Sequence, residues 1–259
     1  MIHRDIANII EEKAPLYLQE SYDNCGFQVG NPEDECTGVI ICVDATEEIL
    51  DEAIEKGCNL VLTHHALLFH AEKQVLARHR MDYVLRKAIK ADITIYSCHT
   101  AIDNAPTLGV SIIDAQMLKL NNIQSIAASG EKVGPVAGNL PCEMTSTEAI
   151  KYVKDTFSCT AARVSYHSSE RSIKKIAIGG GACGDFIKDA IASGADLFVT
   201  SDCKHNLFLD YQKDIILMDL GHFDTEKCTK EIFYKIITEK FPNFAVCKSL
   251  REKNPIIYC

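Results

Sequence analysis

The chain contains 259 residues, of which 47% are hydrophobic and 24% are charged. These proportions are typical of a globular protein and exclude a disordered one. The formal net charge is −9, and no stretch gathers lysines and arginines, so nucleic acid is an unlikely partner. No segment approaches the roughly 18 apolar residues of a membrane span, and we expect no membrane partner.

The first residues and the cysteines favour a cytoplasmic protein. In the segment MIHRDIANIIEEK, Asp5, Glu11 and Glu12 interrupt the apolar positions, which suits a surface helix rather than a signal peptide. The chain has twelve cysteines, which are irregularly spaced, form no C-x-x-C motif and mostly sit in apolar runs. We therefore expect reduced, largely buried thiols.

Apolar runs alternate with amphipathic helical stretches along the chain, which predicts an α/β fold with a partly parallel sheet. One such unit occurs twice. Segment 39–63, VIICVDATEEILDEAIEKGCNLVLT, aligns without gaps on segment 176–200, IAIGGGACGDFIKDAIASGADLFVT. Each copy shows a strand, a loop, a helix, a glycine and a second strand.

A second pairing follows when one residue is inserted, because segment 92–103 resembles segment 214–226. Any two strand–helix units share apolar periodicity, but here a histidine and an acid also recur four residues apart after each strand. The sequence thus predicts an internal duplication into two similar α/β lobes, with mixed sheets flanked by helices and a dinuclear metal site at the strand ends between the lobes. The lobes are expected at 1–125 and 126–240, with a boundary near 121–131, and 241–259 as a C-terminal strand segment returning to the sheets.

Ligands of open α/β sheets bind outside the carboxyl ends of the strands. At one such end, in LVLTHHALLF, the adjacent residues His64 and His65 follow an apolar strand. Neighbouring residues of a regular strand point to opposite sides, so binding through both rings requires two ions or an irregular backbone. The alternative is a pair of exposed loop histidines.

Two further strand ends carry the same chemistry. His99 and Asp103 follow the strand at 93–97, while His222 and Glu226 follow the strand of LMDLGHFDTE. If the helix whose buried face includes Ile232 and Phe233 extends back by one turn, His222 and Glu226 share a face and can bind one cation. The alternative is a helix cap formed by Asp224 or Thr225.

The donors at these three strand ends predict two divalent metal ions per chain. Mixed histidine and carboxylate ligands suit zinc, iron, manganese or cobalt without choosing among them. Two ions roughly 3.5 to 4 Å apart usually need a bridging carboxylate, and Glu226 is the candidate.

The chain resembles the NGG-one-interacting-factor-three family, also named GTP cyclohydrolase I type 2 homologues, in its short form without an inserted domain. The resemblance rests on seven ordered blocks: ESYDNCGFQVG, LVLTHHALLF, YSCHTAID, VGPVAGNLP, IAIGGGACGD, DLFVTSDCKHN and GHFDTEK. The chain departs from the family pattern at Ser201, where glycine is common, and at Phe223, where tyrosine is frequent.

The resemblance implies the metal ligands His64, His65, Asp103, His222 and Glu226. It assigns Asp103 and His65 to one ion and His64 and His222 to the other, with Glu226 bridging. It also implies a ring-shaped homohexamer whose metal sites face an interior cavity. These ligands coincide with the donors found at the strand ends, apart from His99.

The leading functional hypothesis is metal-assisted hydrolysis of a nucleotide or related phosphorylated compound. We expect His99 to carry protons or to orient a ligand, and Asp202 to face the substrate, because it matches His65 in the repeat. His205 and Lys204 could contact a phosphate, as could backbone N–H groups of the glycines at 179–181.

Two other classes of function are less favoured. A non-catalytic metal-binding or scaffold protein remains the main alternative, although none of the twelve cysteines lies near the proposed ligands in a chelating spacing. Binding of nucleic acid in the cavity of a ring conflicts with the negative charge.

Overall fold

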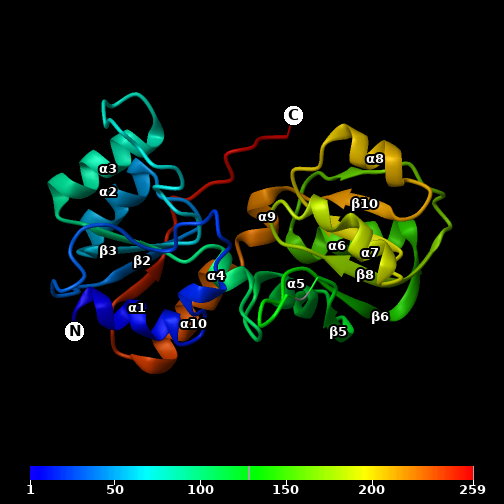
Figure 1. Cartoon of the computed structure of the whole chain (residues 1–259), viewed down its shortest axis with the longest axis horizontal. Coiled ribbons are helices and arrows are strands. Elements are labelled where there is room, and N and C mark those ends of the chain that lie inside the picture. Colours follow the sequence, from blue (N-terminus) through cyan, green and yellow to red (C-terminus); the bar gives the residue numbers. More distant parts are fainter. Residues whose placement is uncertain (128, 259) are drawn as a thin grey trace. The chain divides into compact units, whose positions relative to one another are not determined.

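The computed structural model describes residues 1–127 and 129–258, which form two compact units. Unit 1 comprises Met1–Ala105 and Thr229–Lys253, and unit 2 comprises Pro106–Cys228 and Asn254–Cys259. Figure 1 shows that each unit contains a sheet with helices packed against it. Residue 128, in the predicted boundary region, and residue 259, in the predicted C-terminal segment, lie outside the described residues.

Unit 1 is built on a five-stranded mixed sheet. The strands, in spatial order, are β1 (Gly26–Val29), β4 (Thr94–Ser97), β3 (Leu60–Thr63), β2 (Val39–Cys42) and β11 (Val246–Lys248). All neighbours are parallel except β1, which pairs with β4 in the antiparallel direction. Every residue of β2, β3 and β4 is buried, as expected for parallel strands covered on both faces.

Helices surround this sheet. They are α1 (His3–Glu11), the 3-10 helix η1 (Leu16–Leu18), α2 (Glu47–Lys56), α3 (Arg80–Ala91), α4 (Thr100–Asp103) and α10 (Thr229–Lys240). Helices α2 and α3 lie side by side and share one core cluster with alternate residues of β2 and β3 (Figure 1). Helix α10 contacts α1, β2 and β11. Local signals delimit α2, because the Thr46 side chain caps its first turn and Gly57 ends it with a φ of 67°.

Unit 2 contains a six-stranded mixed sheet. Its strands, in spatial order, are β5 (Asn121–Ser125), β6 (Val136–Thr145), β8 (Ser172–Ile178), β9 (Leu197–Thr200), β10 (Ile216–Asp219) and β7 (Arg163–Val164). Only the pairs β8–β9 and β9–β10 are parallel.

The helices of unit 2 cover both faces of its sheet. They are α5 (Val110–Met117), α6 (Ser146–Phe157), the 3-10 helix η2 (Gly184–Phe186), α7 (Ile187–Ala192), α8 (His205–Tyr211) and α9 (His222–Glu226). Ile176 and Ile178 of β8 enter the cluster with α5 and α6, whereas Ala177 enters the cluster with α7 and α8. Successive side chains of β8 point to opposite faces of the sheet and therefore pack into two different cores.

The predicted repeat recurs in the register of the two sheets. Val39 pairs with Leu60 across β2 and β3, and Ile176 pairs with Leu197 across β8 and β9, which are the aligned positions of the repeat. Strands β2, β3 and β4 are parallel, as are β8, β9 and β10, and next to the last strand of each set lies an antiparallel edge strand, β1 beside β4 and β7 beside β10. Unit 1 adds a fourth parallel strand, β11, beside β2. The two sheets thus share the same core arrangement.

The predicted fold class is confirmed: the protein is mixed α/β, with two mixed sheets flanked by helices. The compact units nevertheless differ from the predicted lobes in two segments. Helix α5, predicted in the first lobe, contacts β6 and β8, while α10, predicted in the second, contacts α1 and β2. Apolar periodicity predicts which face of a helix is buried, but it does not predict which of the two sheets that face packs against. The lobe boundaries stay a prediction.

Buried Glu52 of α2 anchors the segment after β11. Its carboxylate accepts hydrogen bonds from Ser249 Oγ at 2.6 Å, Leu250 N at 3.1 Å and Arg251 N at 3.2 Å, and pairs with Lys56 Nζ at 2.7 Å. Burial alone would raise the pKa of Glu52, but these hydrogen bonds lower it from 4.5 to about 2.

The substitution Glu52→Gln should reduce the free energy of unfolding by about 1–3 kcal/mol at neutral pH, because it removes charged hydrogen bonds from buried groups. The pKa is lower in the folded state, so this stabilisation is complete above pH 4.5 and is lost as the pH falls towards 2. Urea unfolding at several pH values measures it. The control is Glu55→Gln, which alters an exposed ion pair with Arg251. Equal losses in both variants would contradict the anchoring role.

Candidate metal centre

Two adjacent histidines of unit 1 leave the sheet together. After Thr63 the chain stops being a regular strand and bends at His64 and His65. The Thr63 hydroxyl donates to the His65 carbonyl at 2.8 Å, which fixes this bend. The two ring centroids lie 4.9 Å apart with 41° between the planes. Binding through both rings was expected to require either two ions or an irregular backbone, and the backbone here is irregular.

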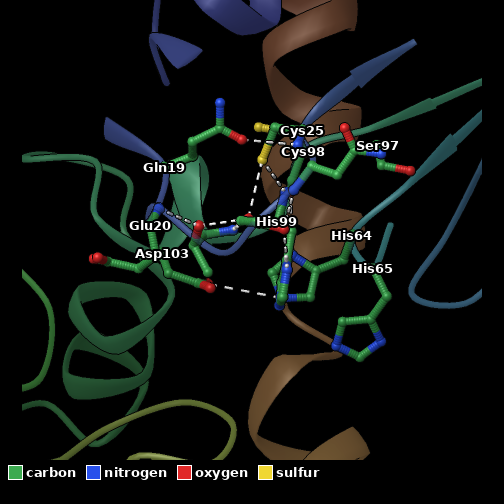
Figure 2. Close-up of polar contacts among 12 residues, drawn as sticks. Gln19, Glu20, Cys25, His64, His65, Ser97, Cys98, His99 and Asp103 are labelled. Atoms are coloured by element: carbon green, nitrogen blue, oxygen red, sulfur yellow. Dashed lines mark hydrogen bonds and ion pairs between the residues drawn. The ribbon is translucent and has the colours of Figure 1, made fainter. Parts of the chain in front are cut away.

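His99 completes a group of three imidazoles. It precedes α4, and its ring centroid lies 5.2 Å from those of both His64 and His65. One nitrogen from each ring lies within 4.8 Å of the others, so the group has the spacing of a site that could hold a metal ion. His64 is fully buried, and Figure 2 shows its ring close to that of His99. The alternative of exposed loop histidines is wrong for His64.

Asp103, at the end of α4, adds a carboxylate to this group. Its Oδ1 lies 3.7 Å from Nε2 of His64, and the dashed line in Figure 2 marks this contact. The four-residue spacing from His99 lets α4 turn Asp103 towards the same rings. Nitrogen and oxygen donors therefore converge at the ends of β3 and β4.

Two further carboxylates orient these rings. Asp44 Oδ1 lies 3.1 Å from Nδ1 of His65, and Asp23 Oδ1 lies 2.9 Å from Nδ1 of His99. Asp23 also accepts hydrogen bonds from the Thr100 backbone N–H and hydroxyl. A carboxylate on one ring nitrogen fixes the tautomer and leaves the other nitrogen available, as in many histidine metal sites.

Burial and hydrogen bonding act against each other on the pKa values here. Burial would raise the pKa of Asp23 and of Asp44, but the hydrogen bonds with His99 and His65 hold both below their ordinary values. Burial would lower the pKa of His99, but the hydrogen bond with Asp23 and the charge of Asp103 raise it. The favourable interactions between ring and carboxylate therefore outweigh desolvation.

The sequence-based reasoning missed Asp23 and Asp44. Asp44 is the second residue after β2, so the rule that located the histidines at strand ends could also have found it. Asp23 lies in a loop 76 residues before His99, and no local periodicity indicates their pairing.

Unit 2 contains a second set of donors. Nε2 of His222 lies 2.9 Å from Oε2 of Glu226, and Nδ1 lies 2.6 Å from Oδ2 of Asp202. Glu226 is buried, whereas Asp202 is exposed and has a positive φ of 54°. His222 therefore has a carboxylate on each ring nitrogen, whereas each histidine of unit 1 described above contacts one carboxylate.

His222 and Glu226 lie on a separate short helix, which differs from the sequence-based prediction. We expected one helix running back from Ile232 to His222, but α9 ends at Glu226 and α10 begins at Thr229. The capping alternative is also wrong, because Thr225 lies within α9 and its hydroxyl accepts a hydrogen bond from Gly181 N. The short helix alone provides the four-residue spacing.

The glycines at 179–181 serve packing. Their backbone N–H groups donate to Val199 O, Ser111 Oγ and Thr225 Oγ1, which contradicts the expected phosphate cradle. A Cβ added to Gly181 would lie 2.1 Å from Oε1 of Glu226, and the φ of Gly181 is 69°. Glycine here gives the buried carboxylate its space.

The remaining candidates lie on α8. His205 is its first residue and lines an open pocket of about 340 Å³ together with Arg163, Tyr166 and Phe208. Lys204 precedes the helix and is exposed. Contacts of His205 or Lys204 with a substrate stay a prediction.

Among the described residues, no helix is long and apolar enough to cross a membrane.

The fold and the donors together define a class of mixed α/β proteins with histidines and carboxylates at the ends of parallel strands. The sequence matches the model of the Duf34/NIF3 (NGG1p interacting factor 3) family over residues 1–255. The chain belongs to this family.

Relatives and solved structures agree with this assignment. The protein named "GTP cyclohydrolase 1 type 2 homolog" of Clostridium perfringens is 36% identical, with 86% of each chain covered. Its namesake in Clostridium acetobutylicum is 31% identical, covering 86% of this chain and 84% of that protein. A Staphylococcus aureus hypothetical protein shares the fold with a TM-score of 0.92 at 26% identity, covering 100% and 99% of the two chains. A Bacillus cereus protein related to NIF3 gives 0.91 at 21% identity, with the same coverage.

The substitution Gly181→Ala should displace the Glu226 carboxylate. The control is Gly194→Ala, because Gly194 has a φ of 77° and nothing within 4 Å of an added Cβ. Both variants should lose about 1–2 kcal/mol of stability through backbone strain, measured by urea unfolding. Only Gly181→Ala should shift the imidazole NMR signals of His222. Unchanged His222 signals in that variant would show that Gly181 does not determine the position of Glu226.

Proposed function

We propose that this protein is a metal-dependent hydrolase acting on a nucleotide or a related phosphorylated compound. The observation that carries the proposal is the gathering of His64, His65 and His99, whose nitrogens lie within 4.8 Å of one another. The two Clostridium relatives are named as homologues of a GTP cyclohydrolase, so GTP is the first compound to test.

The residues fit divalent metal ions. We propose His64, His65 and Asp103 of unit 1 and His222 and Glu226 of unit 2 as the ligands of two ions. Imidazole nitrogen and carboxylate oxygen suit zinc, iron, manganese and cobalt. Asp44 and Asp202 support this assignment, because each contacts Nδ1 of a proposed ligand and thereby fixes the ring.

When bound, two such cations activate water for hydrolysis at neutral pH and polarise the electrophilic atom of a substrate. His99 is the candidate proton carrier: Asp23 holds its Nδ1, so Nε2 is left to exchange a proton with the substrate. Asp202, exposed beside His222, is the candidate substrate contact. His205 and Lys204 are candidate phosphate contacts.

We also propose the homohexamer that the family resemblance implies. Light scattering of the purified protein tests it, with an expected particle mass of six times the 28.7 kDa chain.

Metal analysis should give about two ions per chain, falling to about one or fewer in Glu226→Gln. The amide keeps the size of the side chain but removes the charge that would bridge two cations. The matched control is Glu239→Gln, because Glu239 of α10 is exposed and pairs only weakly with Lys235 at 3.8 Å. Two ions retained in Glu226→Gln would eliminate the bridging role.

Screening nucleotides and phosphoesters with the metal-loaded protein tests the catalytic proposal. His99→Gln should lower kcat by roughly 10²–10⁴-fold while metal content stays unchanged, because general acid–base catalysis contributes that much. His79→Gln replaces an exposed histidine and should leave kcat unchanged. A double variant with His64→Ala and His222→Ala sets the background. If metal binds but no compound exceeds this background, the protein is a non-catalytic metal-binding protein.

A further inference from the structure

Three exposed rings of unit 1 lie beside the histidine group. Tyr22 is 65% exposed and Phe69 is 37% exposed, although the two residues belong to different loops. His70 is exposed as well. The ring centroids of Tyr22 and Phe69 lie 6.3 Å apart, and those of Phe69 and His70 lie 4.9 Å apart. The three rings therefore form one connected aromatic surface, which we call the platform.

Phe69 connects the platform to the candidate metal centre. The centroid of its ring lies 5.9 Å from that of His99, with 67° between the planes. Interacting aromatic rings have centroids roughly 4.5–7 Å apart, so these two rings are in contact. A molecule bound on the platform would therefore lie beside the proposed proton carrier.

Side-chain amides hold the loops that carry these rings. The Asn24 amide donates to the backbone carbonyl of Leu68 at 2.8 Å, and Gln28 Oε1 accepts from the N–H of Leu68 at 3.1 Å. Gln28 Nε2 also donates to the carbonyl of Asn24 at 2.7 Å. The residue before Phe69 is thus tied to the loop that follows Tyr22. Because the backbone is held on both sides, the rings are positioned before a ligand binds, which favours affinity.

The exposure of these rings points to a ligand. Single exposed apolar side chains are common on protein surfaces, whereas adjacent exposed rings usually mark a binding site. The contact with His99 favours a small molecule, because the compound that exchanges a proton with this histidine has to lie next to it. A nucleobase suits such a surface, since its flat face stacks on aromatic side chains while its edges form hydrogen bonds.

We propose that Tyr22, Phe69 and His70 bind the heteroaromatic base of a nucleotide by stacking. This inference rests on the proposed function, which makes a nucleotide or related phosphorylated compound the substrate, and it adds the residues that recognise the base. The platform then selects compounds that carry a base over those that carry only a sugar phosphate.

Guanosine 5′-monophosphate (GMP) and ribose 5-phosphate test this selection, because the second compound is the same sugar phosphate without the base. Calorimetric titration of the metal-loaded protein measures both dissociation constants. We expect the wild-type protein to bind GMP roughly 5- to 140-fold more tightly, since stacking contributes about 1–3 kcal/mol per base. Equal affinities for the two compounds would overturn the proposal.

Variants separate stacking from simple apolar contact. Phe69→Leu keeps an apolar side chain without the ring and should lower the preference for GMP several-fold, as should Tyr22→Leu. Phe69→Tyr keeps the ring and should retain the preference. The matched control is Tyr83→Leu, because Tyr83 of α3 is 43% exposed and lies outside the platform. Affinity for ribose 5-phosphate and metal content should stay unchanged in all four variants, and circular dichroism verifies that they fold.

The platform and the hydrolase proposal can fail separately. If the preference for GMP depends on Phe69 but no compound is hydrolysed, the platform stands and the hydrolase proposal fails. If nucleotides are hydrolysed while Phe69→Leu keeps the wild-type preference, the hydrolase proposal stands and the platform fails. A smaller particle mass of Phe69→Leu in light scattering would show that this surface joins copies of the chain, and would also overturn the platform.

Discussion

The parallel register of β2, β3 and β4 is the constraint on which the candidate centre of unit 1 depends. It aligns the carboxyl ends of the three strands, so that Asp44, His65 and His99 leave the sheet at one edge. Because His64 is fully buried there, its polar ring must be matched by polar neighbours rather than by water. The cluster of rings and carboxylates satisfies this requirement, and it also provides ligand chemistry.

In the second copy of the repeat a histidine again contacts a carboxylate, but the carboxylate stands where the first copy has the histidine. His65 of the first copy aligns with Asp202 of the second, and each forms a histidine–carboxylate contact, His65 with Asp44 and Asp202 with His222. The position of Asp44 is taken by Gly181, whose missing side chain gives room to Glu226. Both copies of the repeat thus place an imidazole against a carboxylate at a strand end. The residue type at each aligned position differs between the copies.

Much of this arrangement can be predicted from the sequence, because the repeat, the buried strands and the histidines at their ends are local patterns. The break between Glu226 and Thr229 could not be predicted, since apolar periodicity continues across it. The partnership of Asp23 with His99 depends on a contact over 76 residues. The hydrogen bonds of the glycines at 179–181 depend on neighbours from other elements, which a glycine-rich motif does not specify.

The return of α10 and β11 to unit 1 has a consequence for biosynthesis. The sheet of unit 1 is complete only when Val246–Lys248 has paired with β2, although most of that unit lies within the first 105 residues. Nearly all of unit 2, by contrast, is one continuous segment, Pro106–Cys228. As the chain leaves the ribosome, unit 2 can close its sheet while unit 1 still exposes the β2 edge. Unit 1 begins first but is finished last.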